Sequence, residues 1–288
     1  MRRLRRLLAK RATRWAERAF VAEGVELVRT ALDAGTLPES VYLATEAATR
    51  SGTPPSGTPP PSGTPPPSGT PPSSGTPPPP GEAAVEVARR AAAAGVRVHE
   101  LAPGVMARVS DTVTPQPLLA VFAMVDREIQ VASGAGLVVV LVDVRDPGNA
   151  GTVLRTADAA GAGAVVFCGS SVDPYNPKAV RSSAGSLFHV PLVVAGDPAA
   201  TLEQLGAMGF RRLGTAVRGG QDYANFDWRV PSAIVLGSEA AGLPAGLPLD
   251  GAVGVPMAGR AESLNVGTAC AVLCFEALRQ QRMGTMPR

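Results

Sequence analysis

The chain has few of the residues that cross-link small proteins or hold structural metals. Its 288 residues include only three cysteines and two histidines. An odd number of cysteines without regular spacing argues against a disulfide framework and is typical of a reducing compartment, so we expect a cytoplasmic protein. Cys270 and Cys274 are four residues apart, but only His99 and His189 could complete a zinc site. We therefore expect two small packing residues and no metal.

Long apolar runs are missing as well. No segment approaches the roughly 20 consecutive apolar residues of a membrane-spanning helix. The N-terminus also lacks the apolar centre of a secretory signal, so we expect no membrane association. An apolar fraction of 45% in 288 residues is nevertheless sufficient for one large or two ordinary domain cores.

Two common nucleotide-binding signatures are absent. A dinucleotide fingerprint needs its glycines between a strand and the helix that follows it. Gly134-Ala-Gly136 instead precedes its predicted strand, and Gly161-Ala-Gly163 ends a predicted helix. No Gly-Lys-Ser/Thr sequence is present either. These observations argue against NAD, FAD and P-loop nucleotide binding.

Positive charge is concentrated at one end of the chain. The net charge is only +3, yet the first eighteen residues hold eight Lys or Arg against a single acid, Glu17. Such a patch favours polyanions through counterion release, which makes nucleic acid the first partner to consider and Arg11 and Arg14 candidate RNA contacts. Two alternatives remain at this point, a solvated basic helix face and a mitochondrial transit peptide.

Residues 51–80 are five imperfect copies of Ser-Gly-Thr-Pro with extra prolines. This composition offers no apolar surface to bury, so we expect a disordered or extended insertion. Its flanks alternate as one smaller α/β domain over residues 1–130, with this insertion inside it. The expected elements are a helix through Leu4, Leu7, Leu8 and Trp15, a second through Val25 to Leu32, a strand at 41–43, a helix over 82–94, a strand over 96–101, a short helix near 103–109 and a strand over 118–125.

A second domain is expected over residues 137–288, after a small-residue linker at 131–136. It opens with Leu137-Val-Val-Val-Leu-Val142, which has the composition of a strand buried on both faces. Helices and strands then alternate, which predicts a mainly parallel sheet covered by helices. The expected helices are 152–160, 177–184, 199–208 and 264–282, and the expected strands are 164–167, 190–194, 212–216, 233–236 and 253–255.

Three separated segments fall at the carboxyl ends of these strands, where an open parallel sheet binds its ligands. They are Asn149-Ala-Gly-Thr-Val-Leu-Arg155, Ile234-Val-Leu-Gly-Ser-Glu239, and Val255-Pro-Met257 with Glu262-Ser-Leu-Asn-Val266. Glu239 needs a donor, and Arg155 or a backbone amide is the expected one. Taken alone, Arg155 could be a helix-surface arginine and Ser263 an ordinary helix N-cap.

The order and spacing of these segments resemble the SpoU/TrmH family of RNA ribose 2′-O-methyltransferases, across roughly residues 137–282. The resemblance implies an α/β fold with a C-terminal trefoil knot, a homodimer, and S-adenosylmethionine as cofactor. Residues 1–125 outside the repeat, with Phe20-Val-Ala-Glu-Gly24 and Thr114-Pro-Gln116, resemble the family's N-terminal substrate-binding domain, which is related to a ribosomal RNA-binding protein. That domain is typical of members that modify ribosomal RNA.

The resemblance also implies the site residues. The catalytic positions that match are Asn149, Arg155, Glu239, Ser263 and Asn265. The cofactor-binding positions are Thr215, Ala216, Gly237, Val255, Met257 and Leu264. Arg155 and Arg279 would contact RNA phosphate; the family proposal that an arginine deprotonates the hydroxyl is less easily reconciled with an always-charged guanidinium.

Two other functions remain compatible with this sequence. One is a noncatalytic RNA-binding or ribosome-assembly factor that keeps the fold, and the other is methylation of transfer RNA. No residue in the sequence indicates a role in antibiotic resistance.

Overall fold

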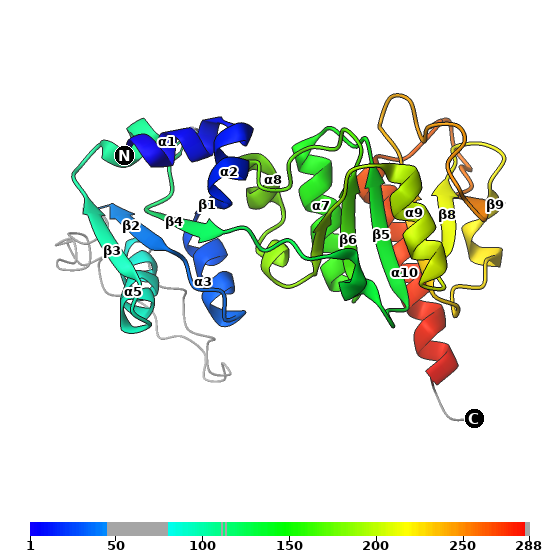
Figure 1. The fold of residues 1–288 in the computed structure, drawn as a ribbon, viewed down its shortest axis with the longest axis horizontal. Coiled ribbons are helices and arrows are strands. Elements are labelled where there is room, and N and C mark those ends of the chain that lie inside the picture. The colour runs from blue at the N-terminus through cyan, green and yellow to red at the C-terminus, as the bar shows by residue number, and fades with distance from the viewer. Residues whose placement is uncertain (45–79, 111, 113, 286–288) are drawn as a thin grey trace, which may run out of the picture.

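The computed structural model describes residues 1–44, 80–110, 112 and 114–285. They form two α/β units side by side, each built on its own sheet (Figure 1). The expected disorder or extension of residues 51–80 concerns residues outside the described ones, except Pro80, which begins helix α5 (Pro80–Ala93). None of the described helices is both long enough and apolar enough to span a membrane.

The N-terminal unit is a four-stranded sheet in the order β1-β4-β2-β3. Its strands are β1 (Ala19–Glu23), β2 (Ser40–Ala44), β3 (Arg97–Leu101) and β4 (Leu118–Ala123). Sequence analysis missed β1, which is buried along its whole length. Its helices are α1 (Arg2–Ala9), α2 (Arg11–Glu17), α3 (Val25–Asp33), α5 and α6 (Val105–Val109). Apolar residues of α3 and α5 pack on one face of the sheet, and those of α1 and α6 pack on the other.

The C-terminal unit is a seven-stranded sheet in the order β7-β6-β5-β10-β8-β11-β9. Every neighbouring pair in it is parallel, as the strand and helix alternation predicts. The strands are β5 (Leu137–Val142), β6 (Ala164–Cys168), β7 (Leu192–Val194), β8 (Arg211–Thr215), β9 (Gln221–Asp222), β10 (Ser232–Leu236) and β11 (Gly251–Gly254). All their carboxyl ends therefore meet at one edge.

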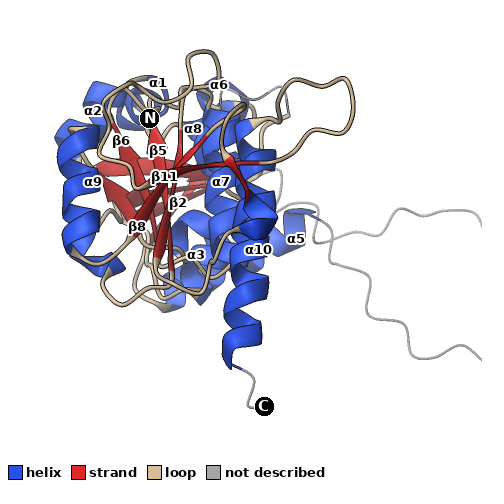
Figure 2. Cartoon of the chain, turned by 90° about the vertical axis from the view of Figure 1, so that its right-hand side faces the viewer, coloured by secondary structure: helices blue, strands red, loops and turns tan. Residues whose placement is uncertain are grey.

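Helices cover both faces of this sheet (Figure 2). On one face lie α7 (Pro147–Ala159), α8 (Pro177–Ser182) and α10 (Val266–Thr285), and on the other lies α9 (Pro198–Ala207). Strand β5 supplies both layers, because successive side chains point to opposite faces: Val139 packs toward α7 and Val140 toward α9. Cys270 and Cys274 are buried in the α10 layer with their sulfur atoms 3.6 Å apart.

The two units are joined by a buried ion pair, which corrects one expectation. Arg14 was predicted to contact RNA, but its side chain is 3% exposed and lies 2.6 Å from Asp173, itself 4% exposed. The guanidinium also donates to the carbonyl oxygens of Leu7 and Leu8. Arg14 is therefore buried in the junction and bonded to Asp173, Leu7 and Leu8, so it is not accessible to an RNA phosphate. Stacked and tilted rings of Phe20, Tyr175 and Phe188 pack at the same junction.

Candidate active site

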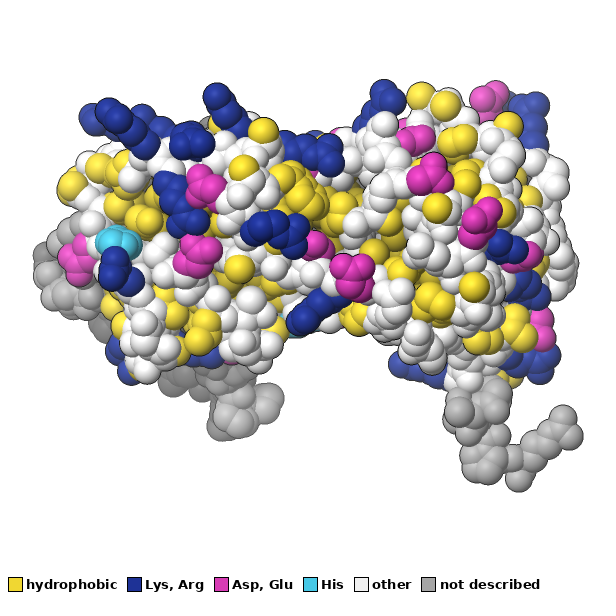
Figure 3. Space-filling model, in the orientation of Figure 1, with side chains coloured by type: hydrophobic (Ala, Val, Ile, Leu, Met, Phe, Trp, Pro, Cys, Tyr) yellow, Lys and Arg dark blue, Asp and Glu magenta, His cyan; other side chains and the backbone are white. Residues whose placement is uncertain are grey.

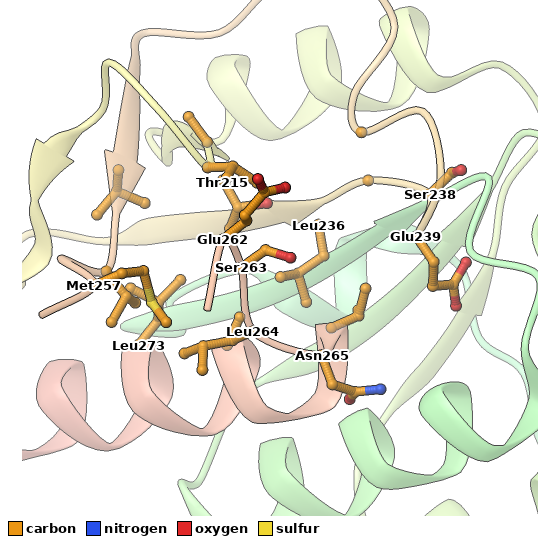
Figure 4. Close-up of a pocket in the computed structure, with 18 residues that line it drawn as sticks. Thr215, Leu236, Ser238, Glu239, Met257, Glu262, Ser263, Leu264, Asn265 and Leu273 are labelled. Atoms are coloured by element: carbon orange, nitrogen blue, oxygen red, sulfur yellow. The ribbon is translucent and has the colours of Figure 1, made fainter. Parts of the chain in front are cut away.

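A cavity of about 320 Å³ opens at the carboxyl edge of the parallel sheet (Figure 4). Its walls come from the segments that follow β8, β10 and β11 and from the first turns of α10. All six predicted cofactor-binding residues line it, together with three of the predicted catalytic residues. The predicted residues in the wall are Thr215, Ala216, Gly237, Val255, Met257 and Leu264, with Glu239, Ser263 and Asn265.

Gly237 is required by the tight turn that follows β10. The N–H of Ser238 donates to the carbonyl of Gly242 at 3.0 Å and the N–H of Gly242 donates back at 2.9 Å, which closes the turn. A Cβ on Gly237 would lie 2.3 Å from the carbonyl carbon of Gly242. Gly242 itself has φ +68, in the region that favours glycine. The backbone of this turn thus forms part of the cavity wall. A larger residue at Gly237 would overlap the Gly242 backbone and force the turn to shift.

Helix α10 begins later in the sequence than the expected start at Leu264. The helix begins at Val266, and the Asn265 side chain accepts a hydrogen bond from the Gly267 N–H at 2.8 Å. Asn265 is therefore the N-cap, and the alternative that Ser263 is an ordinary cap is wrong. Ser263 instead lies in the cavity wall. Gly267 lets α10 approach α7 closely, because a Cβ there would meet Thr152 Cγ2 at 2.7 Å.

Helix α7 begins at Pro147, five residues before the expected start at Thr152. The carboxylate of Asp146 accepts from the Asn149 N–H at 2.8 Å and caps the helix. This hydrogen bond, aided by Lys178 at 3.4 Å, lowers the pKa of Asp146. Asn149 therefore lies in the first turn of the helix and not in a loop. The helical backbone holds its side chain in a fixed direction. Gly151, two residues later, lets α7 pack closely against α8, because a Cβ at this position would overlap Ser182.

A chain of amide hydrogen bonds links all three sequence segments. The Asn149 side-chain amide donates to Glu239 Oε1 at 2.9 Å, and its Oδ1 accepts from Asn265 Nδ2 at 2.8 Å. An ionised carboxylate can only accept, so Glu239 fixes which end of the Asn149 amide is the donor and hence which end faces Asn265. Residues 116 positions apart in the sequence are joined in this way.

Glu239 is held as an anion at the mouth of the cavity. Burial alone would raise its pKa, but the hydrogen bonds from Asn149 and from backbone N–H groups outweigh burial and lower the pKa. The N–H groups of Arg145 and Asp146 each lie 3.4 Å from the carboxylate. Of the two expected kinds of partner, the backbone amide is present, whereas Arg155 makes no hydrogen bond or ion pair with Glu239.

Known proteins resemble both the sequence and the fold. Residues 136–275 match the model of the SpoU rRNA Methylase family. The chain is 39% identical over 184 residues to the 23S rRNA (guanosine(2553)-2′-O)-methyltransferase RlmP of Bacillus subtilis, covering 63% of this chain and 72% of that protein. The chain belongs to the SpoU rRNA methylase family.

Two solved methyltransferase structures extend the likeness over almost the whole chain. An AdoMet-bound rRNA methyltransferase from Sinorhizobium meliloti superposes with a TM-score of 0.76 at 28% identity, covering 99% of this chain and 95% of that one. The SpoU methyltransferase AviRb from Streptomyces viridochromogenes, in complex with AdoMet, gives a TM-score of 0.76 at 26% identity, covering 98% of both chains. The predicted family and α/β fold, including the smaller N-terminal domain, are thereby confirmed, and the chain is an RNA methyltransferase.

Three predicted RNA-contacting arginines of this SpoU chain lie outside the cavity wall. Arg155 is exposed on α7, and within the described part of the chain it has no hydrogen-bonding or ionic partner. Arg279 is exposed on α10 and pairs with Glu276 one turn earlier at 2.7 Å. Arg11 is exposed on α2.

Sequence reasoning also missed residues of this site. Ser238, Glu262 and Leu273 line the cavity, and the backbone of Arg145 and Asp146 holds Glu239. The first two flank residues that were chosen, and Asp146 precedes a proline at a helix start, which is a recognisable capping signal. Leu273 carried no signal, because it resembles any other buried leucine of a helix.

Proposed function

We propose that this protein transfers a methyl group from S-adenosylmethionine to the 2′-hydroxyl of a ribose in ribosomal RNA, in the cytoplasm. The observation that carries the proposal is the linked set Asn265, Asn149 and Glu239 beside a cavity of about 320 Å³. Membership of the SpoU family and the names of the relatives, which act on 23S rRNA, support the choice of substrate.

The cavity suits S-adenosylmethionine in size and chemistry. Its volume lies within the range of roughly 300–1,000 Å³ that is typical of small-molecule sites. Apolar side chains of Leu236, Val255 and Leu273 offer surface for an adenine ring, while the backbone of Gly237 and Gly242 and the Thr215 hydroxyl offer polar atoms. Thr215, Ala216, Gly237, Val255, Met257 and Leu264 would hold the cofactor. When bound, it supplies a methyl group that its sulfonium charge has already activated.

Because the methyl group is activated, the protein's chief task is to align the RNA hydroxyl with it. Glu239 and Asn265 orient Asn149 through the two hydrogen bonds described above. Ser263 adds a hydroxyl to the cavity wall. Arg155 has no competing anion among the described residues, and its permanent charge suits a phosphate beside the target ribose. Arg279 and Arg11 would contact RNA phosphates farther away.

We also propose a homodimer and a trefoil knot. Support for the dimer comes from the exposed sides of α7 and α10, two helices that pack together. Phe275 and Met283 on α10 are 49% and 65% exposed, and Arg155 is exposed on α7. A partner covering this face would bring its own Arg155 toward a cavity whose wall lacks one. Support for the knot comes from the order β8-β11-β9, in which the later strand lies between two earlier ones.

Methyl transfer to RNA by the purified full chain tests this proposal. An in vitro transcript of bacterial 23S rRNA is incubated with the protein and S-adenosylmethionine, then digested to nucleosides for mass spectrometry, which should detect a 2′-O-methyl nucleoside. Arg155→Ala should lower the rate of methyl transfer by a factor of about 10² or more, which is the usual effect of removing a group that transfers a proton or positions the substrate. The variant should still bind the cofactor normally in calorimetry. Arg89→Ala is the control, because Arg89 is an exposed arginine on α5 that pairs with Glu86.

Different outcomes separate the alternatives. No heat of cofactor binding would contradict the proposal and favour a noncatalytic RNA-binding factor. Methylation of a transfer RNA transcript but not of 23S rRNA would change the substrate. Normal turnover by Arg155→Ala would remove Arg155 from the site.

A further inference from the structure

Helix α1 has one buried face and one face that carries only positive charge. Leu4, Leu7 and Leu8 are buried against the N-terminal sheet. Arg2, Arg5 and Arg6 are exposed on the opposite side, and the chain continues with exposed Lys10 and Arg11. Within the described residues, none of these five side chains has a hydrogen-bonding or ionic partner. Figure 3 shows Lys and Arg side chains gathered over α1 and α2.

Two acids that contact α1 are already paired with Arg3. Arg3 pairs with Glu17 at 2.6 Å and with Glu39 at 2.9 Å. The contact with Glu39 also attaches the start of α1 to the residue just before β2. Arg3 offsets the charge of only one of these two acids, but the five unpaired cations still give the surface a net positive charge, which favours a polyanionic ligand.

A pair of stacked rings lies on the same side of the N-terminal sheet. The Tyr42 and His99 rings have centroids 5.0 Å apart and planes 21° apart. Tyr42 packs against the apolar cluster that contains Leu4 and Leu7, and His99 is its direct neighbour across the β2–β3 pair, so both rings face the α1 side. Both side chains are only half-buried, and β3 is the edge strand, so a ring surface remains accessible.

We propose that this N-terminal basic face, defined by Arg2, Arg5, Arg6, Lys10, Arg11 and the Tyr42–His99 pair, binds an unpaired stretch of the RNA substrate. The cations hold consecutive phosphates, and one base stacks on the accessible ring of the pair. Cations beside a stacking platform are the arrangement by which proteins bind single-stranded RNA. The inference rests on the proposed function and adds a second RNA contact, separate from the methylated ribose.

The junction fixes this second contact relative to the cavity. Arg14 belongs to α2, about one turn after the exposed Arg11, and its buried ion pair with Asp173 ties α2 to the catalytic unit. Tyr175, two residues on, donates from its hydroxyl to Asp126 at 2.8 Å, and Asp126 in turn pairs with Arg18. A rigid junction sets a constant separation between the bound unpaired stretch and the ribose that is methylated.

Binding of RNA by the full chain tests the inference. The probe is a fluorescein-labelled oligouridylate of roughly 20 nucleotides, and anisotropy is measured over a range of salt concentrations. Neutralising three cations (Arg5→Gln, Arg6→Gln, Arg11→Gln) should lower the slope of log affinity against log salt by about 2, since each single-strand phosphate contact contributes about 0.7. The matched control removes three arginines that are engaged in exposed ion pairs, Arg29, Arg89 and Arg229, and should leave the slope unchanged.

The ring pair is tested separately. His99→Ala should weaken oligouridylate binding about tenfold through lost stacking, whereas His99→Phe should retain it. His189→Ala is the matched control, because His189 is the other histidine and pairs with Asp158.

Unchanged slope in the charge variant would overturn the inference. Wild-type binding by His99→Ala, with loss in the charge variant alone, would overturn base stacking on the ring pair and leave a surface that holds RNA phosphates only. Neither result alters cofactor binding by calorimetry. A chain that binds oligouridylate as described but gives no heat with S-adenosylmethionine would instead refute the proposed function alone.

Discussion

The basic start of the chain and the catalytic edge of the parallel sheet use charged side chains in opposite ways. On α1 and α2 five cations are exposed and unpartnered within the described residues. At the catalytic edge Glu239 accepts from Asn149 and from two backbone N–H groups, and Asn149 is fixed in turn by Asn265. A mobile cation can follow a flexible polyanion, whereas methyl transfer needs atoms that are already in place. Arg14 lies in the basic segment of the sequence, but in the structure it is buried and paired with Asp173, as the fixed groups of the catalytic edge are paired.

The largest effect is expected from breaking that junction. Arg14→Met leaves Asp173 buried without its cation, so the free energy of unfolding should fall by about 3–5 kcal/mol in urea titrations. Arg11→Met, three residues earlier on the exposed side, should change it by less than about 0.5 kcal/mol. The double variant Arg14→Met/Asp173→Leu should recover much of the loss. Equal losses of unfolding free energy in Arg14→Met and Arg11→Met would contradict the distinction between a buried, paired arginine and an exposed, unpaired one.

A smaller effect is expected from the turn at the cavity. Gly237→Ala places a Cβ 2.3 Å from the carbonyl carbon of Gly242, so the turn must shift. We expect a loss of about 1–3 kcal/mol in unfolding free energy and weaker S-adenosylmethionine binding in calorimetry. Gly196→Ala is the control, because nothing lies within 4 Å of a Cβ there. Wild-type cofactor affinity in Gly237→Ala would show that this backbone does not shape the cavity.

Removing the central amide should slow methyl transfer. Asn149→Ala deletes the donor to Glu239 and the acceptor for Asn265, and loss of a hydrogen bond to a charged group costs about 1.5–3 kcal/mol. We expect about a tenfold lower kcat, at the lower end of that range, with little change in cofactor affinity. The control is Asn225→Ala, an exposed asparagine elsewhere in the catalytic unit. A changed cofactor affinity with normal kcat would place Asn149 in binding instead of alignment.

The smallest effect is a pH dependence. The pKa of Glu239 is lowered in the folded protein, so its contribution to stability is fully present above its unfolded pKa and is lost as pH falls through the folded value. At neutral pH the free energy of unfolding of the wild type should exceed that of Glu239→Gln. The difference should be only a few tenths of a kcal/mol, because the side chain is exposed and solvent screens its charge. The difference should shrink below about pH 4.5. A difference that grew on acidification would reverse the inferred direction of the pKa.

Much of the catalytic unit could be predicted from local patterns. The apolar runs of β5 and β10 are long, continuous and bounded by glycine or polar residues, so strands were expected where they occur. Helix starts were less well predicted. The start of α7 was placed at Thr152 although Asp146 and Pro147 form a recognisable capping pair, and Ser263 was weighed as a cap that Asn265 provides. The sequence predicts no strand at β1, because this short, mostly apolar stretch, Ala19–Glu23, lies between two expected helices.

By itself the sequence determined the alternation of strands and helices, the family, and the residues that gather around one cavity, because these depend on local periodicity and short motifs. Only the tertiary structure decided the partners of the charged groups. Arg14 meets an aspartate 159 positions away, and Glu239 meets Asn149 rather than Arg155. Whether a cation is buried and paired or exposed and available depends on which distant segments the packing of the two units brings beside it, and a one-dimensional pattern carries no such distances.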